Sequence, residues 1–173
     1  MENDIIKTLE GKLVVIGIGN ILRGDDGAGP ALVKTVQERL EKSNVRHPDL
    51  VLIDAGEAPE NHLGKVVALD PDTVLLVDAA DFKASPGTAR LIRPDTIDLS
   101  GLSTHNASLK LSLDFLKAQS RAEIQLVGIQ KKNIRLGEAI SEPVRNTIRQ
   151  IAESLVALAL KQGKGVMERP DHA

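Results

Sequence analysis

The chain has 173 residues, of which 42% are hydrophobic and 27% charged, an ordinary globular balance with enough length for one domain and a sizeable core. Its net charge of −2 provides no basic field for nucleic acid, and two Phe with no Tyr or Trp leave little to stack on bases. The absence of cysteine excludes disulfides, thiolate metal sites and a cysteine nucleophile. No signal-peptide core or membrane-length apolar run is found, so we expect a cytoplasmic protein without membrane insertion.

The first predicted strand, Leu13–Ile18, leads into a glycine-rich turn with two adjacent carboxylates, ahead of a helix expected over Ala31–Leu40. The turn reads Gly17-Ile-Gly19-Asn20-Ile-Leu22-Arg-Gly24-Asp25-Asp26-Gly27. A dinucleotide fingerprint needs a third glycine where Leu22 stands, and the acids would repel a pyrophosphate, so a nucleotide is the minor hypothesis. Carboxylates here can present oxygens to a hard or borderline metal, which favours a ligand-binding loop over a connector with solvated acids.

Other short, apolar, β-branched runs predict buried strands, with amphipathic helices between them. The strands are expected over Leu50–Ile53, Val74–Val77 and Ile124–Ile129, with an antiparallel edge strand over Thr88–Ile92; the helices are expected over Ala107–Lys117 and Val144–Leu160. Ser141, as N-cap, and Pro143 mark the start of the last helix. This alternation predicts an α/β fold, a three-layer αβα domain over residues 1–161 with a five-stranded mostly parallel sheet. Residues 162–173 lack periodicity and are expected to form a flexible C-terminal tail.

Several acids follow the carboxyl ends of the predicted strands, where open α/β sheets bind their ligands. Asp25 and Asp26 follow the first strand, Asp54 ends the second and Asp78 ends the third. We expect these acids at one edge of the sheet, with Asp26 and Asp78 on solvent-facing loops, and such crowded carboxylates imply a cation. His105 precedes a helix and can face the same edge. Two carboxylates and one imidazole from three loops would make an open site suited to zinc or nickel.

The residues alone leave the activity open. There is no Gly-x-Ser-x-Gly elbow and no His-Glu-x-x-His motif. Two classes therefore stand: a hydrolase that uses a metal, and a non-catalytic module that binds a metal or nucleotide or recognises a metallated partner. Two assignments are open within the loop. Either Asp26 is the ligand, or Asp25 is the ligand and Asp26 caps the helix.

From about Leu13 to Leu160 the chain resembles the maturation endopeptidases of nickel–iron hydrogenases. The resemblance is carried by Gly17-x-Gly19-Asn20-x-Leu22-x-x-Asp25-Asp26-Gly27-x-Gly29, Asp54-Ala-Gly-Glu-Ala-Pro-Glu60, Val77-Asp78-Ala followed by Pro86-Gly87-Thr88, Thr104-His105, and Val127-Gly-Ile-Gln130. These motifs lean toward the HycI-like subgroup, with Lys131 standing where that subgroup often has proline.

The resemblance implies an aspartyl-type endopeptidase that removes a C-terminal extension from the precursor of a hydrogenase large subunit after nickel insertion. By motif position, the catalytic and metal-binding residues of the family fall on Asp26, Asp78 and His105, and we expect Asp25 and Asp54 to support them. Nickel is expected to arrive with the precursor, and no organic cofactor is expected. Whether a metal is resident, and the oligomeric state, stay open.

Overall fold

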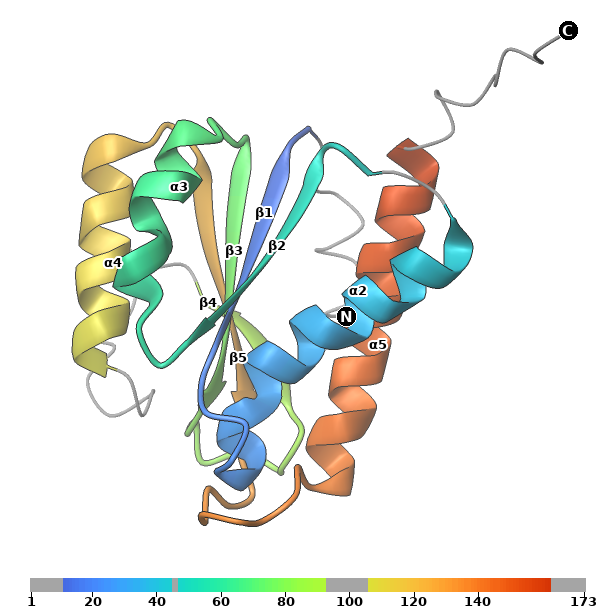
Figure 1. Cartoon of the computed structure of the whole chain (residues 1–173). Coiled ribbons are helices and arrows are strands. Elements are labelled where there is room, and N and C mark those ends of the chain that lie inside the picture. Colours follow the sequence, from blue (N-terminus) through green and yellow to red (C-terminus); the bar gives the residue numbers. More distant parts are fainter. Residues whose placement is uncertain (1–10, 45–46, 93–105, 163–173) are drawn as a thin grey trace, which may run out of the picture.

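The structure is a computed structural model, and it describes residues 11–44, 47–92 and 106–162. Its centre is a five-stranded sheet in the order β2-β1-β3-β5-β4 (Figure 1). The strands are β1 (Leu13–Ile18), β2 (Leu50–Gly56), β3 (Thr73–Ala80), β4 (Ala89–Ile92) and β5 (Glu123–Gln130). All neighbours pair in parallel except β4, which is antiparallel to β5 at one edge. The predicted mostly parallel sheet with an antiparallel edge strand is confirmed.

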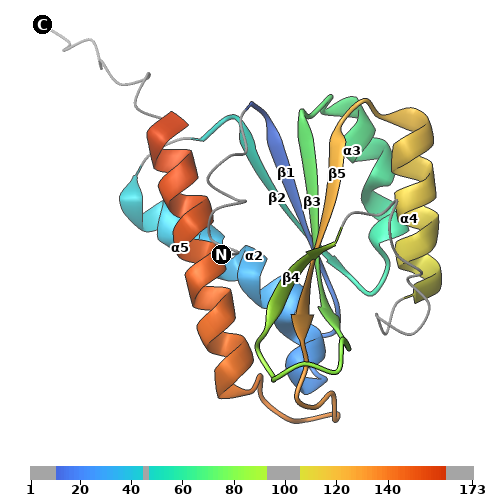
Figure 2. The same cartoon turned by 180° about the vertical axis from the view of Figure 1, so that it is seen from behind.

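Helices cover both faces of the sheet and complete three layers. They are α2 (Ala28–Ser43), α3 (Leu63–Ala68), α4 (Asn106–Gln119) and α5 (Glu142–Gln162), with short 3₁₀ helices η1 (Gly24–Gly27) and η2 (Pro59–His62). Figures 1 and 2 show α2 and α5 side by side on one face and α3 and α4 on the other. Neither η2 nor α3 was predicted from the sequence, and the tail predicted over 162–173 begins at Gln162, which belongs to α5. Residues 163–173 lie outside the described part of the chain.

The core consists of two apolar layers, because successive strand residues point to opposite faces. On β1 and β3, the side chains toward α2 and α5 are Leu13, Val15, Leu75 and Val77, and those toward α3 and α4 are Val14, Ile16, Val74 and Leu76. Both strands are buried throughout, as expected for central parallel strands covered on both faces. In the described part of the chain, no helix combines the length and the hydropathy that a membrane crossing requires.

Two glycines allow the start of α2 to lie directly against the sheet. A Cβ added to Gly29 would lie 2.4 Å from the backbone nitrogen of Ile18 and 2.5 Å from the carbonyl oxygen of Val77. Gly19 has a φ of +133°, and a Cβ there would lie 1.7 Å from the carbonyl oxygen of Asp26. The glycine-rich turn therefore serves close packing of η1 and α2 onto the ends of β1 and β3.

Gly29→Ala tests this packing, with Gly64→Ala as a matched control. Both residues stand second in a helix, but a Cβ on Gly64 would meet no atom within 4 Å. We expect Gly29→Ala to lower the free energy of unfolding by about 3 kcal/mol, because the atoms it meets are backbone. Gly64→Ala should raise it by between zero and about 1 kcal/mol through helix propensity. Urea denaturation measures both, and equal effects would contradict the packing role.

Candidate active site at the carboxyl edge of the sheet

Asp26 and Asp78 lie at the carboxyl edge between β1 and β3. Asp78 directly follows Val77, which pairs with Gly17 of β1, and Asp26 lies in η1, just before the helix that rests on these strand ends. Each carboxylate residue is only 1% exposed, so the expectation of solvent-facing loop acids was wrong. Asp78 also lies within β3 instead of ending it, because Ala79 and Ala80 continue the pairing with β5.

Asp25 serves a different purpose from its neighbour, because its carboxylate ties η1 to the segment between β5 and α5. Its Oδ2 accepts hydrogen bonds from the backbone nitrogens of Lys132 (2.6 Å) and Asn133 (3.1 Å) and from the Ser141 hydroxyl (3.0 Å). Its Oδ1 accepts one from the Ser141 backbone nitrogen (2.7 Å). Asp26, in contrast, accepts through Oδ2 from the backbone nitrogen of Asn20 (3.1 Å). The four hydrogen bonds of Asp25 give it a structural role, which weakens the alternative in which Asp25 is the ligand.

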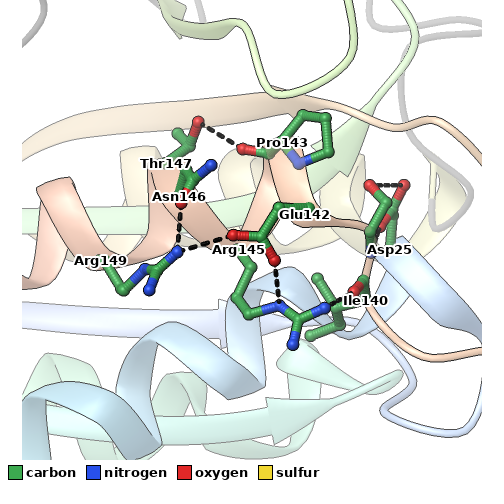
Figure 3. A network of polar contacts seen from close by, with 9 residues as sticks. Asp25, Ile140, Glu142, Pro143, Arg145, Asn146, Thr147 and Arg149 are labelled. Atoms are coloured by element: carbon green, nitrogen blue, oxygen red, sulfur yellow. Dashed lines mark hydrogen bonds and ion pairs between the residues drawn. The ribbon is translucent and has the colours of Figure 1, made fainter.

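The start of α5 is held by further contacts, which Figure 3 shows beside Asp25. Ser141 directly precedes the helix as predicted, and its carbonyl accepts from the Arg145 backbone nitrogen (2.9 Å). The Arg145 guanidinium donates to the carbonyl of Ile140 (2.9 Å) and pairs with Glu142 (3.4 Å). These side chains are exposed and contribute little stability individually. Their effect is to fix the helix end that carries a partner of Asp25.

Asp54 lies at the same edge but does not join Asp78. It pairs with Gly17 inside β2, and a register shift follows it. By alternation it shares the α2 and α5 face with Leu52, whereas Asp78 shares the opposite face with Leu76. Asp54 is exposed, and its Oδ1 accepts from the backbone nitrogen of Gly56 (3.0 Å). The prediction that Asp54 ends its strand was wrong, and its carboxylate caps a local turn.

His105, the third predicted ligand, lies outside the described residues. The helix that follows it, α4, covers the face to which Asp78 belongs. Its first turn lies at the carboxyl edge, because the Ser108 hydroxyl donates to Glu60 (3.3 Å) of η2, the segment that follows β2. Among the described residues, no three His, Cys, Asp or Glu side chains group closely enough to hold a metal ion. Convergence of Asp26, Asp78 and His105 therefore stays a prediction.

Gln130 is a residue whose role sequence reasoning missed, although its motif contributed to the resemblance. At the end of β5 it organises the loop after β3: its buried amide oxygen accepts from the backbone nitrogens of Phe82 (2.6 Å) and Ala84 (3.3 Å). Its amide nitrogen donates to Asp81 (3.3 Å). The Lys83 ammonium and backbone N–H, followed by this amide, lower the pKa of Asp81 to about 2.

The backbone amides of the glycine-rich loop are already used, which argues against a phosphate site. The nitrogen of Gly24 donates to Glu138 O (3.1 Å), that of Asp25 to Asn133 O (3.0 Å) and that of Asp26 to Arg23 O (3.2 Å). A phosphate-binding loop directs such amides at its ligand. The loop has instead the geometry of a support for buried carboxylates.

Comparisons with known proteins agree with this fold and show the family. The family model described as HycI, hydrogenase maturation protease, matches residues 30–158. The Hydrogenase 3 maturation protease of Escherichia coli K12 is 34% identical over 143 residues, covering 82% of this chain and 87% of that protein. The crystal structure of the protease HycI from Thermococcus kodakarensis KOD1 superposes with a TM-score of 0.80 at 30% identity, covering 92% of this chain and 98% of that one. A crystal structure of a Hydrogenase 3 maturation protease gives a TM-score of 0.70 at 31% identity, over 86% and 91% of the two chains.

The fold and these matches define a peptidase built on a three-layer α/β scaffold. More particularly, the chain belongs to the hydrogenase maturation protease family.

Asp25→Ala tests the connection between η1 and α5, with Asp54→Ala as its control. Asp25 is 0% exposed, and its replacement leaves the amides of Lys132, Asn133 and Ser141 without this acceptor. We expect the free energy of unfolding to fall by about 2–4 kcal/mol. Asp54→Ala removes one exposed hydrogen bond and should change it by less than about 0.5 kcal/mol. Denaturant titration of both variants measures these free energies. An Asp25→Ala variant as stable as the wild type would refute the connection between η1 and the segment before α5.

Proposed function

We propose that this protein is an endopeptidase that removes the C-terminal extension of a nickel–iron hydrogenase large-subunit precursor after nickel insertion. In this proposal Asp26, Asp78 and His105 recognise nickel held by the precursor. The observation that carries it is the pair of buried carboxylates at the carboxyl edge between β1 and β3, in a member of the hydrogenase maturation protease family.

The donor set suits nickel that another protein already holds. Carboxylate and imidazole are acceptable ligands for a borderline divalent metal, and the chain has no cysteine that would compete for the ion as a soft ligand. Such a set can add to a partly occupied coordination shell instead of extracting the metal. Nickel then enters as part of the substrate, and when bound there it would supply Lewis-acid chemistry for hydrolysis of the peptide.

The protein's own residues have distinct tasks in this proposal. In it, Asp26 and Asp78 present carboxylate oxygens to the nickel from the ends of the β1–β3 pair, on backbone that strand pairing and the glycine contacts of α2 fix. A rigid support matters because ligands must be held close to their productive positions before the substrate arrives. Asp25 adds to that support through its hydrogen bonds to the segment before α5.

Replacement of the three proposed ligands should stop processing of the precursor. Asp26→Asn and Asp78→Asn keep the shape of the buried side chains, and His105→Ala removes the imidazole. We expect each substitution to slow removal of the extension by about 100-fold or more, because the loss of a ligand weakens binding of the metal and its activation of the peptide. Mass spectrometry of the precursor measures the cleavage.

The matched control is Asp114→Asn, which removes an exposed carboxylate paired with Lys110 on α4. It should process the precursor at the wild-type rate. Thermal denaturation of each variant separates loss of chemistry from loss of folding. Normal processing by all three ligand variants would refute the proposed roles.

The proposal also predicts that nickel in the precursor, and not metal in the protease, decides cleavage. Metal-free protease should cleave a nickel-loaded precursor and leave a nickel-free precursor intact. A chelator should block processing only when it strips nickel from the precursor, as metal analysis of that precursor can show. Inhibition while the precursor keeps its nickel would overturn this prediction, as would cleavage of the nickel-free form.

A further inference from the structure

Three large apolar side chains are exposed together beside the site. Ile21 is 66% exposed, Leu22 62% and Leu136 74%; the other exposed large apolar side chains in the described part of the chain are Leu111 and Phe115, both on α4. We call Ile21, Leu22 and Leu136 the apolar rim. Single exposed apolar residues are normal, but a group of them beside a functional site indicates a surface that a partner covers.

The rim is built on two loops that hydrogen bonds hold together. The backbone nitrogen of Gly137 donates to the carbonyl of Leu22 (2.8 Å), which places Leu136 and Leu22 on adjoining backbone. The Gly24 nitrogen donates to Glu138 (3.1 Å), and the Asp25 carboxylate joins the same two segments. Because this backbone is ordered before a partner binds, burying the rim costs little conformational entropy.

The apolar rim also borders the proposed site directly. A Cβ added to Gly27, the residue after Asp26, would lie 2.8 Å from the Cα of Ile21. A peptide lying on the rim would therefore be next to η1 and its buried acid.

The charges around the rim are mainly positive, against a chain whose net charge is −2. Arg23, Lys132 and Arg135 are exposed on the same two loops. The exposed acids beside them are Glu138, on the second loop, and Glu57, which accepts from the Asn20 amide (3.1 Å). Within the described residues, no ion pair is formed by any of these three cations. Unpaired surface cations attract carboxylates and speed encounter with a partner that carries them.

We infer that the apolar rim, with Arg23, Lys132 and Arg135, is the docking surface for a segment of the hydrogenase precursor that combines apolar side chains with carboxylates. The inference rests on the proposed function and adds to it the chemistry of the substrate segment that is recognised. Docking there delivers the adjoining part of the precursor to Asp26 and Asp78. The alternative is that a second copy of this chain binds to the rim.

The test is the double variant Leu22→Gln/Leu136→Gln, with Leu111→Gln as the matched control. All three leucines are exposed, so the substitutions should leave the melting temperature unchanged. With nickel-loaded precursor, the double variant should raise KM about tenfold and retain kcat. The reason is that the apolar contacts it loses bind the ground state and the transition state equally. Leu111→Gln should match the wild type.

Binding without turnover is measured by placing the same changes on an Asp78→Asn background. The dissociation constant for the intact precursor should rise about tenfold with the rim changes. Arg135→Glu should raise it at low salt and have a smaller effect at high salt, where charges are screened. A dissociation constant unaffected by these changes would overturn the docking surface.

The outcomes separate this inference from the function on which it rests. If the wild type cleaves the precursor and the rim variants match it in KM and binding, the docking surface is wrong and the proposed function stands. If the wild type neither binds nor cleaves any nickel-loaded precursor from the source organism, both fail. If the rim changes instead convert a dimer to a monomer without affecting KM, the rim joins copies of this chain and the inference is overturned.

Discussion

The buried carboxylate of Asp25 connects two parts of the chain on which the rest of the site depends. Its four hydrogen bonds join η1 to the segment between β5 and α5, across more than a hundred residues of sequence. A buried carboxylate is costly unless hydrogen bonds compensate it, so this geometry is strongly favoured once formed. It fixes the conformation of η1 and therefore the position of Asp26. It also holds together the loops that expose Ile21, Leu22 and Leu136.

Glycine packing places the same loop against the sheet from the other side. Because Gly29 and Gly19 have no side chains, α2 and η1 rest on the backbone of β1 and β3. The glycine-rich sequence after β1 resembles a nucleotide-binding fingerprint, yet the backbone amides of this loop donate to carbonyls of the protein. The glycines thus bring a carboxylate, not a phosphate, to the switch in strand order where α/β sheets bind ligands.

Much of the fold could be predicted from the sequence because it depends on local patterns. Apolar β-branched runs predicted the strands, and the run over Thr88–Ile92 predicted the antiparallel edge strand that the structure confirms as β4. Helix α3 has only six residues, too few for a clear periodic signal. Strands β2 and β3 extend further than predicted, to Gly56 and Ala80. Their last residues are small and lack the large apolar side chains that indicate a buried strand.

The site was less predictable because it depends on contacts distant in sequence. Nothing local distinguishes Asp25 from Asp26; the difference comes from donors 107 to 116 residues further along the chain. The motif that ends in Gln130 was visible, but its clamp on the loop after β3 requires the register between β3 and β5. Asp54 and Asp78 looked equivalent until the sheet showed them on opposite faces.

The roles proposed for Asp26, Asp78 and His105 require that they complete the coordination of nickel held by the precursor. X-ray absorption at the nickel edge measures this most directly, on nickel-loaded precursor mixed with the protease and frozen before cleavage. The account predicts additional oxygen and nitrogen scatterers in the nickel shell when wild-type protease is added. They should be absent with a triple variant that carries Asp26→Asn, Asp78→Asn and His105→Ala. A nickel spectrum that wild-type protease leaves unchanged, under conditions where cleavage proceeds, would contradict the account.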